Sequence, residues 1–443
     1  MFIGEKFMQK KYVKRIVKIT VCIILFWGLI CWMNFLFCDF NIDRWGRILW
    51  HNYYTETDNI DNLFLGSSHV YHGINPFLSD ELNGGNNFNL ASNSQRLNGT
   101  YYLLREANED HHLSHVYLDL YYGVSTGLDA DFKQRDNLAA GWRNTDFMKF
   151  SINKIEYMLT MCEIENYPET FIPFLRYRSK LFDAEYVKNQ IEYKSEEDYK
   201  QYKYSDMTDS NDVIEYRDKG FCYIEEELQQ KDLRWGPDKI LNENSFTEDA
   251  EYYLRKIIEY CQNEDIDLTL FSAPMYELQL ISVENYDIYV KQIRQIAAEY
   301  GLSYYDFNLC GEEYFPIQKI EYFRDPGHLN SRGADLFTSF FWKVMEEESM
   351  DYFYDTYGEK LENSKEAVYG LICTAEDDMV NYRIASNRES EMEYRVVALP
   401  EKQIQDFSEN KEFTLKADVH GIFRIEARKT GEDEILSSLE IAY

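Results

Sequence analysis

Short apolar runs recur through the middle of the chain, and longer amphipathic stretches separate them. The compact, proline-free runs are typical of buried strands and cover residues 63–65, 87–91, 116–120, 266–272 and 302–307. Stretches with a helical period lie at residues 95–108, 247–263 and 284–300, with Ser282 as a candidate N-cap of the last. Strands that alternate with helices predict an α/β fold, a parallel sheet covered on both faces.

Two further regions break this rhythm. Residues 124–244, within a catalytic domain expected at 58–350, are rich in Tyr, Lys, Glu and Asp and predict a mostly helical insertion of the kind that shapes a substrate cleft. From residue 364 to 443 the pattern changes to short alternating runs separated by turn residues, which predicts a small all-β, sandwich-like module. Its role, glycan contact or packing against the catalytic domain, stays open at this point.

The N-terminal region carries the strongest single hydrophobic signal. Residues 19–38 contain no formal charge, and about 20 apolar residues suffice to cross a bilayer. No small-residue cleavage site follows, which favours an uncleaved anchor that a connector at 39–57 joins to the catalytic domain. Before the run stand six basic residues and one acidic residue, so residues 1–18 are expected in the cytoplasm and the rest outside the cell; the basic residues are Lys6, Lys10, Lys11, Lys14, Arg15 and Lys18.

Composition narrows the class of protein. A net charge of −32 over 443 residues argues against nucleic acid as a partner and favours an exported domain that faces a cell wall. The 8 Cys are scattered without a C-x-x-C pair, which provides no zinc or redox motif. His111, His112 and His115 have no neighbouring ligand pattern and are expected to form a turn. We therefore predict no metal and no cofactor.

Two short motifs carry candidate chemistry. Gly66-Ser67-Ser68-His69 follows the first predicted strand directly, where a tight turn would present a serine hydroxyl at the carboxyl edge of the sheet. Asp325-Pro326-Gly327-His328 places a carboxylate three residues before an imidazole, so the carboxylate can orient the ring while the ring takes the serine proton. An amphipathic helix after Leu329 is expected to fix this second turn against the core.

The order of these motifs resembles the SGNH/GDSL hydrolase superfamily, which has a flavodoxin-like, three-layer fold; here GSSH stands for its first motif and DPGH, followed by LNSRGA, for its last. The chain is most similar to a membrane-anchored bacterial branch that includes the teichoic-acid D-alanyl-transfer protein and alginate O-acetyltransferase-like proteins. The resemblance implies that Ser68 is the nucleophile and an oxyanion donor through its N–H, Asp325 the orienting acid and His328 the base. It also implies acyl transfer beside a polytopic membrane O-acyltransferase.

The superfamily's other site residues, which bind the oxyanion, are only partly matched in this chain. The superfamily places a Gly after the second strand and an Asn after the third, and neither stands here. The expected substitute donors are the backbone N–H of Ser92 or Asn93, or the Asn93 amide. Asp119 is expected either to line the cleft or to serve a turn, and His69 and His72 are expected at the rim that meets the substrate.

Three functions remain open from the sequence. The first is serine-dependent transfer of an O-acetyl or D-alanyl group to a cell-wall or exopolysaccharide polymer. The second is a carbohydrate O-acetylesterase that uses the same residues with water as the acceptor. The third is a non-catalytic wall-binding scaffold. In each case we expect a single-pass membrane protein with an extracellular domain and a surface polysaccharide or teichoic-acid-like polymer as its partner.

Overall fold

The computed structural model describes residues 2–38, 44–56, 58–207, 213–316, 319–388, 390–400, 402–418 and 420–442. Its centre is a five-stranded parallel sheet in the order β2-β1-β3-β8-β9, as predicted. The strands are β1 (Asn62–Gly66), β2 (Asn87–Ala91), β3 (His115–Asp119), β8 (Asp267–Ser272) and β9 (Tyr304–Asp306). Parts of the expected connector, residues 39–43 and 57, lie outside the described residues.

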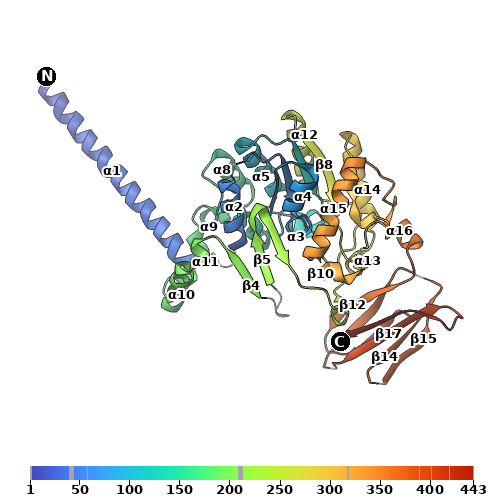
Figure 1. The fold of residues 1–443 in the computed structure, drawn as a ribbon. Helices are drawn as coiled ribbons and strands as arrows, with labels where there is room; N and C mark the ends of the chain where they lie inside the picture. The colour runs from blue at the N-terminus through green and yellow to red at the C-terminus, as the bar shows by residue number, and fades with distance from the viewer. Residues whose placement is uncertain are drawn as a thin grey trace.

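Helices cover both faces of this sheet (Figure 1). On one face Phe341 of α15 packs against Phe64 of β1 and Phe271 of β8, and α15 contacts α3 and α4. On the other face α5 packs against α12, and α14 contacts β9. The helices are α3 (Ser68–Gly73), α4 (Pro76–Asn83), α5 (Leu97–Asp110), α12 (Glu248–Asn263), α13 (Glu277–Ser282), α14 (Tyr286–Glu299), α15 (Ser331–Glu347) and α16 (Tyr357–Asn363).

Local chemistry sets the helix ends. The Thr247 hydroxyl accepts a hydrogen bond from the N–H of Ala250 and begins α12. The expectation for α14 was wrong, because Asn285 is its N-cap and Ser282 ends the preceding helix, where its hydroxyl donates to the carbonyl of Gln279. A serine hydroxyl bonds a local carbonyl as readily as it caps a helix.

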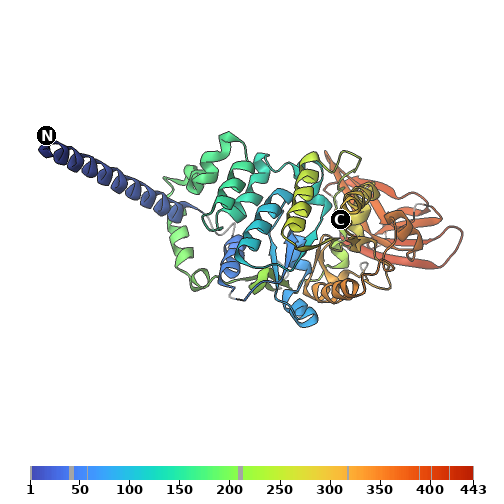
Figure 2. The same cartoon turned by 90° about the horizontal axis from the view of Figure 1, so that it is seen from above.

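The N-terminal helix α1 (Phe2–Phe37) projects from one end of the molecule (Figures 1 and 2). Residues 12–37, whose most apolar 18-residue window has a mean hydropathy of 2.3, form one helix long and apolar enough to cross a membrane. A short helix, α2 (Arg44–Thr55), follows and buries Trp50 and Tyr53 in the core.

The insertion between β3 and β8 begins with helices and continues as strands. The helices are α6 (Tyr122–Ser125), α7 (Leu138–Thr145), α8 (Ile152–Thr160), α9 (Tyr167–Phe171), α10 (Ala184–Ser195) and α11 (Glu197–Lys200). An antiparallel sheet that the sequence pattern did not indicate follows, with strands β4 (Tyr204–Met207), β5 (Val213–Arg217) and β6 (Phe221–Ile224). Strands this short carry little periodic signal.

Antiparallel strands make up the C-terminal region, which forms two four-stranded sheets in the orders β16-β13-β12-β7 and β15-β14-β17-β18. Aromatic rings meet between them, since Phe423 of β17 contacts Tyr382 of β13 and Phe413 of β16. The strands are β12 (Val368–Glu376), β13 (Met379–Ser386), β14 (Met392–Ala398), β15 (Lys402–Ser408), β16 (Glu412–Lys416), β17 (Ile422–Lys429) and β18 (Ile435–Ala442). The insertion supplies β7 (Arg234–Trp235), which pairs in parallel with β12.

Candidate active site

The turn after β1 presents Ser68 at the carboxyl edge of the sheet. Gly66 has a φ of +156°, and a Cβ there would lie 2.6 Å from Val70 Cγ2 and 2.8 Å from Asp119 Cβ. Only glycine fits this position without displacing its neighbours. Ser67 is extended and buried as the N-cap of α3, and its Oγ has no hydrogen-bond partner within the described residues. Ser68 begins α3 and is the serine that contacts a histidine.

Ser68 and His328 lie 260 positions apart in the chain, yet their side chains meet. The Ser68 Oγ lies 2.8 Å from Nε2 of His328. On the other side of the ring, Nδ1 lies 2.9 Å from Oδ1 and 3.1 Å from Oδ2 of Asp325. The structure therefore joins the hydroxyl, the imidazole and the carboxylate in a continuous relay of hydrogen bonds.

Asp325 is arranged to stay ionised. Burial acts to raise the pKa of this carboxyl, but the charge of His328 and its hydrogen bond, with Arg324 and the Gly327 N–H, outweigh it and hold the pKa well below its usual range. An ionised carboxylate accepts a hydrogen bond from Nδ1–H, so this tautomer leaves Nε2 free to accept the proton of the Ser68 hydroxyl.

The turn that carries His328 is fixed from several sides. Asp325 Oδ1 also accepts hydrogen bonds from the N–H groups of Gly327 (2.9 Å) and His328 (3.0 Å). The two short strands β10 (Phe323–Asp325) and β11 (His328–Leu329) pair across the turn, and the Tyr276 N–H donates to the carbonyl of Pro326. Rigid placement of an acid and a base is what a relay of this kind needs.

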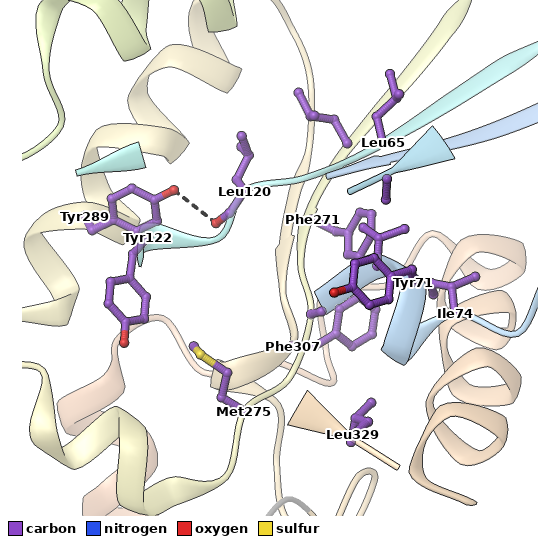
Figure 3. Packing of buried hydrophobic residues seen from close by; sticks show 14 of the residues in the cluster. Leu65, Tyr71, Ile74, Leu120, Tyr122, Phe271, Met275, Tyr289, Phe307 and Leu329 are labelled. Atoms are coloured by element: carbon purple, nitrogen blue, oxygen red, sulfur yellow. Dashed lines mark hydrogen bonds between the residues drawn. The ribbon is translucent and has the colours of Figure 1, made fainter. Parts of the chain in front are cut away.

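Contacts of the residues after His328 explain why the run LNSRGA has an asparagine and a glycine at these positions. The Asn330 side-chain oxygen caps α15 by accepting from the N–H of Gly333, and its amide donates to the carbonyl of Glu321. A Cβ at Gly333 would lie 2.1 Å from the carbonyl oxygen of Tyr322, so a side chain cannot fit there. Figure 3 shows Leu329 with Tyr71, Ile74 and Phe307 among the residues of the buried cluster, and β11, which carries Leu329, contacts α3.

His69 and His72, expected at the rim that meets the substrate, are both buried. Their ring centroids lie 4.9 Å and 5.2 Å from that of His328. Burial, and next the charge of His328, hold the pKa of each well below its usual value, so both rings are neutral near pH 7. Neutral rings in these positions pack against the base and limit the room available for its movement.

Tyr121 packs against His69, and Gln279 holds Tyr121 in place. Neither residue was expected at the site from the sequence. The Tyr121 ring lies 3.9 Å from the His69 ring, and the Gln279 amide donates to the Tyr121 hydroxyl (3.0 Å) and the Tyr122 hydroxyl (2.9 Å). Tyr121 follows the third strand and thus stands at the predicted edge. Gln279 belongs to α13, far from either motif, and no local pattern marks it.

The expected oxyanion residues occupy different environments. The Ser92 side chain is buried, where its Oγ donates to Gln95 Oε1 and accepts from the Asn144 amide. Asn93 is exposed, and its side-chain oxygen accepts from Ser94 Oγ. Ala91 pairs with Gly66, so this segment runs beside the nucleophile turn. Within the described residues neither side chain forms a hydrogen bond to Ser68.

Asp119 is buried behind the turn at Gly66. Its Oδ1 accepts a hydrogen bond from the Ala273 N–H (3.0 Å), while Oδ2 has no hydrogen-bond partner among the residues described. Burial, and more weakly the charge of Asp306, raise the pKa of Asp119 to about 7. Since Asp119 Cβ fills the space beside Gly66, this residue supports the turn from the core side.

No metal-binding group of three or more His, Cys, Asp or Glu occurs within the described ranges. His115 Nε2 lies 2.8 Å from the Thr269 hydroxyl, and His111 Nδ1 accepts from the N–H of Ile60, so these two rings point to separate partners. A cavity of about 870 Å³ lies at the amino ends of β3 and β8, on the sheet edge opposite Ser68, and holds none of the three relay residues.

Comparisons with known proteins do not assign the chain to a family. No family model matches it, and no curated protein is significantly similar to it. The geometry of Ser68, His328 and Asp325 is therefore the observation on which a functional assignment depends.

Proposed function

We propose that this chain is a serine-dependent acyl-transfer enzyme of the SGNH/GDSL type, anchored in the cell membrane by α1. The observation that carries the proposal is the relay in which Ser68 Oγ lies 2.8 Å from His328 Nε2 and His328 Nδ1 lies 2.9 Å from Asp325. A partly buried relay with these distances and an ionised acid favours catalysis over a binding scaffold.

The first half of the reaction forms an acyl-enzyme. The Ser68 oxygen attacks the carbonyl carbon of an ester donor, while His328 Nε2 takes the hydroxyl proton and Asp325 stabilises the resulting imidazolium. The tetrahedral oxyanion accepts a hydrogen bond from the Ser68 N–H at the beginning of α3. When the carbon–oxygen bond to the donor alcohol breaks, His328 returns the proton to that alcohol and Ser68 keeps the acyl group.

The second half decides between transfer and hydrolysis. A polymer hydroxyl attacks the acyl carbon, His328 takes its proton, and the Ser68 bond breaks to give a new ester and the free hydroxyl. Water in the same position gives a carboxylic acid instead. The proposed acceptor is a cell-wall or exopolysaccharide polymer, the acyl group is O-acetyl or D-alanyl, and the proposed partner that supplies the acyl donor is a polytopic membrane O-acyltransferase. The apolar α1 supports a site beside the membrane, and the basic residues before its apolar run support an N-terminus in the cytoplasm.

The test is a partition experiment. The full chain in lipid nanodiscs is incubated with 4-nitrophenyl acetate and short wall-derived oligosaccharides, and acetylated sugar and free acetate are quantified by mass spectrometry. Transfer predicts acetylated sugar whose amount rises with acceptor concentration. The Ser68→Ala variant should form neither product, and Ser438→Ala, an exposed serine in β18, should behave as wild type. Acetate alone would favour an esterase, and equal turnover by Ser68→Ala would refute the proposal.

A further inference from the structure

Exposed apolar side chains gather in one part of the insertion. Outside α1, five large hydrophobic residues in the described chain are more than 70% exposed, and four of them fall in residues 150–191. They are Phe150 (83%), Ile152 (75%), Ile164 (74%) and Phe182 (100%). Isolated exposed apolar residues need no explanation, whereas four in one stretch of the insertion make that stretch a candidate contact surface. We call these four residues the apolar patch.

The same segment holds the end of α1. The Lys194 Nζ, itself buried, donates to the carbonyl oxygens of Phe35 (2.6 Å) and Cys38 (2.8 Å). The Tyr186 hydroxyl donates to the carbonyl of Phe37 (2.9 Å). The last carbonyls of a helix lack partners within the helix, so α10 both satisfies them and fixes the insertion to the point where the apolar helix ends.

The elements that carry the apolar patch continue from this junction. The 3-10 segment Pro173–Lys180 contacts both α1 and α9, and α9 contacts α8. Phe182 lies two residues after that segment, and Ile164 precedes α9. Ile152 begins α8, and Phe150 lies two residues before it. Figures 1 and 2, drawn from perpendicular directions, both show these helices at the end of the molecule from which α1 leaves.

Charge allows this part of the surface to approach a bilayer. Residues 150–191 contain five Lys or Arg and six Asp or Glu, whereas the whole chain has a net charge of −32. Several of these charges neutralise one another in ion pairs, which include Lys180 with Asp183 and Arg178 with Glu169. A nearly neutral surface is neither repelled from nor drawn to anionic headgroups, so apolar contact determines how it binds.

We propose that the apolar patch inserts into the interfacial layer of the same bilayer that α1 spans, as a second, monotopic membrane contact. This inference rests on the proposed membrane anchor. A single tether lets a domain rotate about it, whereas a span and a patch that are fixed to each other set its orientation. The relay of Ser68 would then stand at a constant height above the lipid, where a membrane-bound acyl donor can meet it.

The test uses photo-crosslinking in the full chain. p-Benzoylphenylalanine replaces one residue at a time, Phe182 or Ile152, in phosphatidylcholine nanodiscs, and lipid adducts are measured by mass spectrometry after irradiation. Phe26 in α1 is the positive control, and Ile435, exposed on β18 of the distant C-terminal region, is the matched negative control. Lipid adducts at position 182 should exceed those at 435 roughly tenfold or more, the ratio that burial of one aromatic side chain corresponds to.

The outcomes separate the inference from its premise. If position 26 gives lipid adducts while positions 152 and 182 give no more than position 435, the second contact is overturned and the anchor stays intact. No adducts at position 26 would overturn the membrane placement of α1 and the second contact together, whereas the Ser68 chemistry would still stand or fall on the partition experiment.

Discussion

At the scale of single residues, the structure separates Ser68, the serine that the sequence motif selects, from its neighbour Ser67. Ser67 Oγ is buried, while Ser68 Oγ lies 2.8 Å from His328 Nε2. The difference arises from the turn at Gly66, which the residue types predict, and from the approach of a segment 260 positions away, which they suggest only through the D-x-x-H spacing. The roles of Ser68, Asp325 and His328 in catalysis stay predictions.

Asp325→Asn tests the orienting acid. Its side-chain oxygen can still accept the N–H bonds of Gly327 and His328, so the turn should keep its shape. The amide nitrogen would favour the wrong imidazole tautomer, and we expect acylation of Ser68 to slow by about 10³–10⁴-fold. Stopped-flow release of 4-nitrophenol measures the rate, and a thermal unfolding midpoint near that of wild type verifies the fold. A rate within tenfold of wild type would contradict this role.

Asp119→Asn tests the buried carboxyl behind the nucleophile turn. The pKa of Asp119 is about 7 in the folded protein and about 4 in an unfolded chain. Between these values the folded state holds a proton that the unfolded state has released, so rising pH lowers the free energy of unfolding. Asparagine lacks this dependence, and the variant should therefore gain on the order of 2–3 kcal/mol relative to wild type between pH 5 and pH 8.

Chemical unfolding of both proteins at the two pH values measures this gain. A difference in stability that stays constant from pH 5 to pH 8 would show that Asp119 is ionised in the folded state throughout. The sequence placed Asp119 at the edge of the third strand. The sequence did not reveal that Asp119 is buried, because this burial depends on how closely Gly66 and Ala273 approach the side chain.

At the scale of elements, strand and helix positions around the parallel sheet follow from local pattern. The five strands of the sheet and the helices between them lie within a few residues of the expected positions, because buried parallel strands and amphipathic helices have distinct periods. The sheet β4-β5-β6 escaped prediction because its strands are short. The prediction of Ser282 as an N-cap was wrong because a serine hydroxyl can form a hydrogen bond with more than one local backbone group.

Lys360→Met tests a junction between elements. The Lys360 Nζ donates to Glu277 Oε2 at 2.6 Å, and both side chains are almost completely buried, so this pair ties α16 to α13. The single variant leaves a carboxylate buried without its cation and should lower the free energy of unfolding by about 3–5 kcal/mol. The Lys360→Met/Glu277→Gln variant removes both charges and should recover part of that loss.

Thermal unfolding of the single and double variants provides the comparison. If the free energy of unfolding of the double variant were lower than that of the single variant by about another 3–5 kcal/mol, the two residues would act independently. The sequence provides no indication of this pair, since positions 277 and 360 lie in separate helices whose packing is a tertiary property.

At the scale of the whole molecule, the parts depend on one another more than the sequence pattern suggests. The insertion supplies β7 to the C-terminal sheet and Lys194 to the end of α1. It therefore contacts both ends of the chain. Composition could indicate an apolar helix, an α/β region and an antiparallel region, but contacts between distant segments are set by tertiary packing, which composition does not encode.

The central claim is that Ser68 carries the acyl group. The most direct measurement is intact-protein and peptide mass spectrometry of the full chain in nanodiscs after brief incubation with 4-nitrophenyl acetate and an acid quench, with wild type and Ser68→Ala compared. The account predicts a single acetyl adduct on the peptide that contains Ser68, absent from the variant. An equal adduct in the variant, or an adduct on another residue alone, would contradict it.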